Sequence, residues 1–165
     1  MPIPESAGVK TLLKEELEKT LFPREDTVTP INLLYSPKHT WAQITPEGNI
    51  RVGLTEYAHR HLQGVAYLYT EPVGKEINKA GPFGVAETWM YMFDLYSPVS
   101  GKIVKVNPKL NEDNYIVDEG PYKGWILEIK PENPSILKHE LNDLLSARKY
   151  NEMVANKTVS KLQLK

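Results

Sequence analysis

The residue types that carry most enzyme chemistry are sparse in this sequence, and their spacing forms no catalytic set. The chain has no cysteine, which excludes thiolate nucleophiles, disulfides and cysteine-based metal sites. His59 and His61 lie two residues apart in an expected helix, so they face different ways and make a poor metal pair. We expect both to be solvated. No Ser-His-Asp or paired-carboxylate arrangement can be argued from the spacing, so we expect no catalytic residue and no metal site.

Five consecutive large apolar side chains stand out instead: Trp89, Met90, Tyr91, Met92 and Phe93. In a hairpin, alternation places Trp89, Tyr91 and Phe93 on one side and the two methionines on the other. A tight hairpin cannot bury all of them, and exposed aromatic and methionine side chains are typical of contact surfaces. The pattern predicts contact with a protein partner or a second copy. The alternative is internal cover by the N-terminal extension or the C-terminal helix.

The bulk composition is that of one ordinary globular domain. The chain has 165 residues, of which 41% are hydrophobic and 25% charged, which fits a single core. Twenty basic and 21 acidic residues leave a net charge of −1, so we expect no nucleic-acid partner. No run approaches the roughly 20 apolar residues of a membrane span, and no signal segment is apparent. We expect a cytoplasmic protein.

Hydrophobic periodicity divides the chain into three parts. Residues 1–29 form an expected extension with a short amphipathic helix, whose apolar positions recur every three or four residues: Val9, Leu12, Leu13, Leu17 and Leu21. Residues 30–156 form the expected domain, which includes a C-terminal helix. Residues 157–165 lack a periodic face and form an expected frayed tail.

The central part alternates in the manner of strands. We expect strands at Ile50–Leu54, Val65–Tyr69, Phe83–Trp89, Ile103–Val106 and Trp125–Lys130. A short helix is expected over Thr55–Leu62, capped by its threonine. Asn133 and Pro134 predict the start of the C-terminal helix, with a break near Ser146. The fold class is therefore mainly β with peripheral helices (α+β).

Several motifs then resemble, in order and spacing, those of the glycine cleavage system H protein family. They cover most of the chain: Tyr35–Trp41, Gly53–Ala58, Pro72–Gly74, Phe83–Glu87, Asp94–Gly101, Pro121–Trp125 and Asn133–Ser135. The resemblance implies a barrel-sandwich hybrid of two antiparallel sheets, like lipoyl and biotinyl carriers. It also implies a non-catalytic shuttle that carries a lipoyl arm among the enzymes of glycine cleavage. His39 belongs to the opening motif, where we expect a structural hydrogen bond.

The lysine that carries lipoate in the resembled family is replaced here. The family hairpin reads glutamate, a small polar residue, an apolar residue, the modified lysine, and then small residues up to an aspartate. Counting three forward from Glu87 or four back from Asp94 reaches Met90. Lipoylation needs an amine that attacks an activated acyl group, and a thioether has none. We predict no lipoyl cofactor at this position.

Two further features leave alternatives open. Gly74 and Glu87 resemble the family's recognition elements for the attaching enzyme, although a turn glycine and a hairpin hydrogen bond explain them equally. Lys75, Lys79 and Lys102 are other conceivable acceptors. We expect an unlipoylated H-like protein that binds partners, among them glycine cleavage or other lipoate-pathway enzymes. The alternative is a lipoyl carrier of glycine cleavage or a related pathway that uses a different lysine.

Coexpression with a lipoate ligase and free lipoate is predicted to leave the intact mass of the chain unchanged, because Met90 cannot be acylated. Mass spectrometry of the purified protein checks this. A gain of one lipoyl group, mapped to any lysine, contradicts the prediction.

Overall fold

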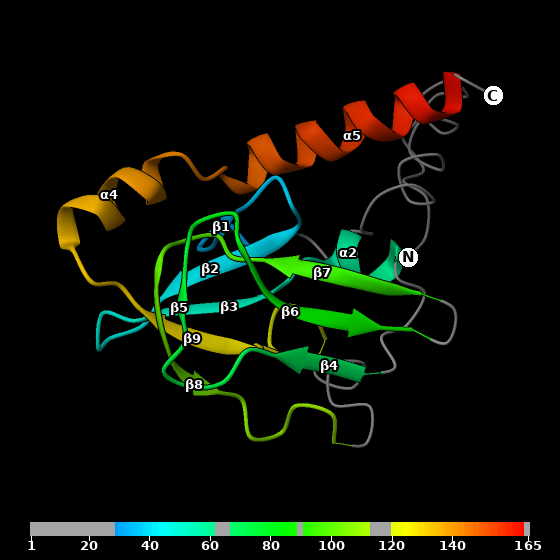
Figure 1. The fold of residues 1–165 in the computed structure, drawn as a ribbon. Coiled ribbons are helices and arrows are strands. Elements are labelled where there is room, and N and C mark those ends of the chain that lie inside the picture. The colour runs from blue at the N-terminus through cyan, green and yellow to red at the C-terminus, as the bar shows by residue number, and fades with distance from the viewer. Residues whose placement is uncertain (1–28, 62–66, 89–90, 113–119, 164–165) are drawn as a thin grey trace.

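The computed structural model describes residues 29–61, 67–88, 91–112 and 120–163. Two antiparallel sheets face each other, with helices at their margins (Figure 1). The elements are β1 (Leu34–Tyr35), β2 (Thr40–Ile44), β3 (Ile50–Leu54), α2 (Glu56–His61), β4 (Tyr67–Thr70), β5 (Glu76–Ile77), β6 (Pro82–Glu87), β7 (Met92–Tyr96), β8 (Gly101–Val106), β9 (Leu127–Lys130), α4 (Pro134–Asn142) and α5 (Ala147–Gln163).

The larger sheet has six strands in the order β1-β2-β3-β9-β8-β5. Its β2–β3 hairpin pairs Trp41 with Gly53. A Cβ at Gly53 would stand 2.3 Å from the Trp41 ring, so the indole lies directly on that backbone. The indole nitrogen of Trp41 donates to the Pro121 carbonyl at 2.9 Å. The glycine thus lets one large ring fasten the hairpin to the turn before β9.

The smaller sheet has three strands in the order β4-β6-β7. β6 and β7 form a hairpin, and β4 pairs with the other side of β6. In Figure 1 the end of β6 and the start of β7 lie at the right, at the opposite end of the view from α4 and β5. β4 and β7 are therefore the two edge strands of this sheet, and β7 is also one arm of the hairpin.

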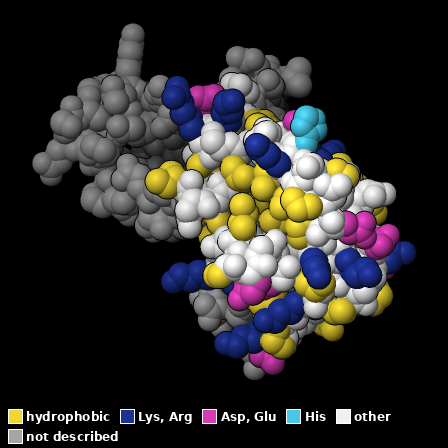
Figure 2. All heavy atoms as spheres, turned by 90° about the vertical axis from the view of Figure 1, so that its left-hand side faces the viewer, with side chains coloured by type: hydrophobic (Ala, Val, Ile, Leu, Met, Phe, Trp, Pro, Cys, Tyr) yellow, Lys and Arg dark blue, Asp and Glu magenta, His cyan; other side chains and the backbone are white. Residues whose placement is uncertain are grey.

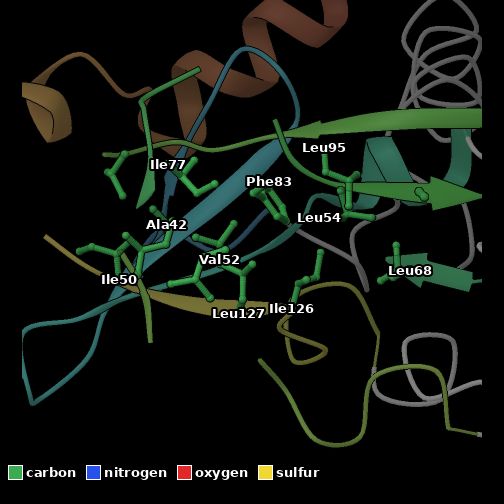
Figure 3. Packing of buried hydrophobic residues seen from close by; sticks show 14 of the residues in the cluster. Ala42, Ile50, Val52, Leu54, Leu68, Ile77, Phe83, Leu95, Ile126 and Leu127 are labelled. Carbon is green, nitrogen blue, oxygen red and sulfur yellow. The ribbon is translucent and has the colours of Figure 1, made fainter. Parts of the chain in front are cut away.

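The core lies between the two sheets and consists of alternating inward-facing side chains. Figure 3 shows aliphatic residues of β2, β3 and β9 meeting Phe83, Leu95 and Leu68 of the smaller sheet. Phe83, Ile50 and Val52 have no exposed surface. No described helix is long and apolar enough to cross a membrane.

Helix α5 is fastened to the sheets by Tyr150. The ring of Tyr150 is 2% exposed and stacks on Tyr35 at a centroid distance of 5.0 Å. Its hydroxyl is 2.7 Å from Thr55 Oγ1 and 2.8 Å from His39 Nδ1. Burial raises the pKa of Tyr150 far above its ordinary value, so this hydroxyl stays protonated. It therefore serves as a structural link.

Most of the elements expected from the sequence are present. β3 has the expected bounds, α2 begins directly after Thr55, and the break between α4 and α5 contains Ser146. The expected strands at 65–69 and 83–89 overlap β4 and β6, and β6 ends at Glu87, before Thr88. The expected tail begins at Lys157, whereas helix α5 extends as far as Gln163. The expected helix at 9–21 lies outside the described residues.

Replacing Tyr150 with phenylalanine is predicted to lower the free energy of unfolding by about 1–3 kcal/mol, because it removes a buried hydroxyl shared by two polar partners. Urea unfolding measures this. Tyr91→Phe, which removes an exposed hydroxyl, is the matched control and should change stability by less than about 0.5 kcal/mol. Equal effects of the two substitutions contradict the assigned role.

Candidate functional site

The β6–β7 turn that carries the five large side chains is tight. Thr88 N donates to the Tyr91 carbonyl at 2.8 Å, and Tyr91 N donates to Thr88 Oγ1 at 3.0 Å. Two residues, Trp89 and Met90, separate this bonded pair in the sequence, and both lie outside the described residues. The loop is therefore of the two-residue length that is common in hairpins.

The three described members of the predicted contact site are exposed. Tyr91 is 59% exposed, Met92 63% and Phe93 38%. The Tyr91 and Phe93 rings are 5.9 Å apart, as expected for alternate residues on one side of a strand, while Met92 falls on the other side. Neither side of the hairpin end is covered by the described residues to the degree seen in the core.

Glu87 ends β6 beside this site. It is paired with Met92 on β7 and with Tyr67 on β4. The Tyr69 hydroxyl donates to Glu87 Oε1 at 3.3 Å, and the negative charge of Glu87 raises the pKa of Tyr69. The carboxylate is thus held over the outer face of the sheet, next to the Tyr67 and Tyr69 rings, whose centroids are 4.7 Å apart.

Gly74, the other predicted recognition element, lies elsewhere. It stands in the turn before β5 with a positive φ of 96°, a conformation that glycine adopts without strain. Its N–H donates to the Ile103 carbonyl of β8 at 2.7 Å. β5 and β8 lie at the opposite end of the view in Figure 1 from the end of β6 and the start of β7. Glu87 therefore lies beside the hairpin, whereas Gly74 lies in a turn that is remote from it.

A groove adjoins the hairpin, which sequence patterns did not predict. It has a volume of about 440 Å³ and lies between β7, helix α2 and the β1–β2 turn. Its apolar wall comprises Leu54, Tyr57, Ala58, Phe93 and Leu95, and the rest of its lining comes from Pro37, Lys38, His39, Asp94 and Tyr96. The lining residues come from separate segments of the chain, so no local motif could have indicated the groove.

His39 supports one end of this groove. Its ring lies 4.5 Å from that of Tyr57 on α2 and bonds the Tyr150 hydroxyl. Its φ is 71°, and its carbonyl accepts from Thr55 N at 3.1 Å. The expected structural hydrogen bond of His39 is confirmed. Thr55 and Tyr150 are the partners that sequence reasoning did not assign.

A second hollow of about 370 Å³ lies at the other end of the molecule, between β5, β8 and α4. Figure 2 views this side of the molecule. It shows hydrophobic side chains gathered near the middle of the view, with charged side chains around them. The Glu140 carboxylate here accepts from Ser100 N at 2.9 Å and also bonds the Ser100 hydroxyl. That carboxylate thus fastens α4 to the loop before β8, and the hollow does not extend the hairpin site.

His59 differs from the expectation of a solvated side chain. Its Nε2 is buried, and no described residue hydrogen-bonds it. Burial lowers the pKa of His59 below its ordinary value, an effect partly opposed by Glu56. The residue as a whole is half-buried, and periodicity in a helix of six residues cannot reveal which atom of the ring is covered. The side chain of His61 is not among those described. No three His, Asp or Glu side chains of the described residues gather as a metal site.

Comparison with known proteins identifies the family. Residues 33–157 match the sequence model of the glycine cleavage H-protein, which spans the sheets, the groove and most of the helices. The chain belongs to the glycine cleavage H-protein family. Members are non-catalytic lipoyl carriers, so the chain is not an enzyme.

Individual relatives agree with this. A "Probable glycine cleavage system H protein" of Pyrococcus abyssi is 38% identical over 122 residues, which cover 74% of this chain and 89% of that protein. The glycine cleavage system H protein of Geobacillus sp. is 38% identical over 76% of this chain and 96% of its own. The crystal structure of the H protein from Mycobacterium marinum has a TM-score of 0.62 at 29% identity, covering 73% of this chain and 94% of that one.

The buried Nε2 atom of the half-buried His59 predicts a pH dependence of stability. Because its pKa is lowered in the folded state, the unfolded chain binds more protons near pH 6, and stability falls as pH drops below about 6.5. His59→Gln should flatten the decline in unfolding midpoint between about pH 7 and 5. The matched control, His139→Gln on the exposed face of α4, should leave the slope unchanged. A slope unaffected by His59→Gln contradicts the prediction.

Proposed function

We propose that this H-family protein is not lipoylated at the usual position and acts as a non-catalytic protein-binding module. The observation that carries the proposal is the hairpin loop, where Met90 is followed by Tyr91 and Met92, both more than half exposed. An amine at the loop would serve as an acyl acceptor, whereas the loop residues here offer none.

The exposed side chains suit this hairpin to contact with a partner protein better than to attachment of a lipoyl group. Covering even about 200 Å² of apolar surface at roughly 25 cal/mol per Å² contributes on the order of 5 kcal/mol before the entropic costs of association. Aromatic and methionine side chains favour such centres because they bury much surface with few rotatable bonds or adapt to irregular gaps. The proposed contact residues are Trp89, Met90, Tyr91, Met92 and Phe93, with Glu87 beside them.

The family narrows the class of partner. H proteins interact with the enzymes of glycine cleavage, and the retained scaffold supports docking to those enzymes or to others of lipoate pathways. The two sheets fit a barrel-sandwich hybrid of the lipoyl-carrier type. The cytoplasm is the compartment we propose.

Use of another lysine finds no support in the geometry. Lys79 Nζ is 3.1 Å from an Asp143 carboxylate oxygen, an ion pair with α4. Lys75 precedes β5 and Lys102 lies on β8, in the part of the molecule remote from the β6–β7 turn (Figure 1). None of the three stands at a hairpin tip comparable to that between Thr88 and Tyr91.

Changing Trp89 and Tyr91 together to serine is predicted to weaken self-association or capture of purified glycine cleavage enzymes, and to leave the unfolding midpoint near that of the parent. Sedimentation velocity, pull-down with the purified enzymes and thermal unfolding measure the three quantities. The matched control is Ile44→Ser with Ile136→Ser, which removes two exposed apolar side chains away from the hairpin.

The opposite result is equally clear. A marked fall in unfolding temperature with association unchanged shows that the chain itself covers the tip, and it contradicts the contact role. Equal loss of capture in the Ile44 and Ile136 variant shows that the effect is not specific to the hairpin.

A further inference from the structure

The three-stranded sheet has two outer edges, and the chain treats them differently. At β4, the side chain of Asn111 accepts from Leu68 N at 2.7 Å and donates to the Leu68 carbonyl at 2.7 Å. This amide imitates a neighbouring strand and closes the edge. At β7, no described strand pairs on the side away from β6.

The pattern of hydrogen bonds identifies the open groups on β7. Thr88 and Tyr91 form a bonded pair, and bonded and non-bonded pairs alternate along an antiparallel ladder. Met92 and Asp94 therefore direct their N–H and C=O groups away from β6.

One contact supports this orientation. The Tyr96 carbonyl, two residues beyond Asp94, points away from β6 and accepts from Thr40 Oγ1 at 3.0 Å. The side of β7 facing away from β6 thus presents backbone donors and acceptors up to the point where β2 begins.

The groove lies along this open edge. Side chains of a strand added to β7 would alternate, as in any sheet. Those on the side of Phe93 and Leu95 would enter the 440 Å³ groove, against Tyr57 and Ala58 of α2. The groove therefore favours apolar side chains at alternate positions of the incoming segment.

The other side of β7 carries charge. Met92 and Asp94 are exposed there, and no described residue forms an ion pair with Asp94. Next along the strand, Lys38 Nζ lies 5.5 Å from the Tyr96 ring centroid. The strand thus presents an apolar, an acidic and a basic position in succession, and an antiparallel segment complements it with an acidic, a basic and an apolar residue.

A second copy of this chain fits the edge poorly. Antiparallel pairing of β7 with itself about Asp94 places two carboxylates opposite each other, and like charges across a sheet are unfavourable. A charge in the middle of an open strand is also a device that opposes pairing between copies. The charge pattern thus favours a partner that supplies a cation.

We propose that the open edge of β7 receives an extended segment of a partner protein as an added antiparallel strand. Its apolar side chains enter the groove, and a basic side chain lies beside Asp94. This inference rests on the proposed function, since it specifies how the binding module takes its partner. Backbone hydrogen bonds supply affinity, while the groove and Asp94 supply selectivity.

Two synthetic peptides test the proposal on the full chain. The first is acetyl-Ser-Glu-Val-Lys-Val-Leu-Ser-amide, and the second has glutamate in place of its lysine. NMR titration measures the affinities, and amide hydrogen exchange measures protection of Met92 and Asp94. We expect the first peptide to slow exchange at both amides and to bind about tenfold more tightly than the second.

Charge reversal gives the decisive comparison. Asp94→Lys should reverse the preference, so that the glutamate peptide binds more tightly. The matched control, Glu47→Lys, makes the same change in net charge at the exposed β2–β3 turn and should retain the preference of the parent.

Two results overturn the strand addition: unchanged exchange at Met92 and Asp94 in saturating peptide, or a preference that Asp94→Lys does not alter. If these occur while the Trp89 and Tyr91 substitutions still abolish enzyme capture, the binding function stands and its mode differs. If the peptides bind as expected and enzyme capture is unaffected, the edge is a docking site and the hairpin tip is not.

Discussion

The hydroxyl of Tyr150 is the interaction on which the surroundings of the groove depend. It joins His39 in the β1–β2 turn, Thr55 at the start of α2 and helix α5 itself. These three segments are far apart in the sequence, and a buried hydroxyl with two polar partners fixes them in one arrangement. Because His39 and α2 form two walls of the groove, a residue on the C-terminal helix determines the shape of a surface that it does not line.

The smaller sheet turns that scaffold into a binding surface. Its outer strand β4 is closed by the amide of Asn111, while no strand of the described residues pairs with the outer side of β7 beside the groove. An open edge is a hazard for aggregation unless a charge or a specific partner protects it, and Asp94 supplies the charge. The hairpin end adds exposed apolar surface at Tyr91 and Met92. Under the proposed function, the side chains of the hairpin and the edge of β7 would contact the partner directly.

Local sequence patterns predicted the elements well where short-range physics decides them. The alternation over Ile50–Leu54 gave a strand with the observed bounds, and Thr55 marked the start of α2. Asn133 caps α4 through bonds from Ser135 N and Ile136 N. These features depend on pleat periodicity and on the unpaired N–H groups at a helix start, both of which are legible within a few residues.

The sequence by itself determined the absence of thiol chemistry, the methionine at the hairpin loop and the run of large apolar side chains that cannot all be buried. Only the tertiary structure decided which side chains are exposed and which hydrogen-bond partners the buried polar groups have. The two hydrogen bonds between the Asn111 side chain and the Leu68 backbone, for example, join residues 43 positions apart in the chain. The groove likewise exists only because separate segments converge on β7. Side-chain identity is local, whereas solvent exposure and hydrogen-bond partners are set by packing between elements.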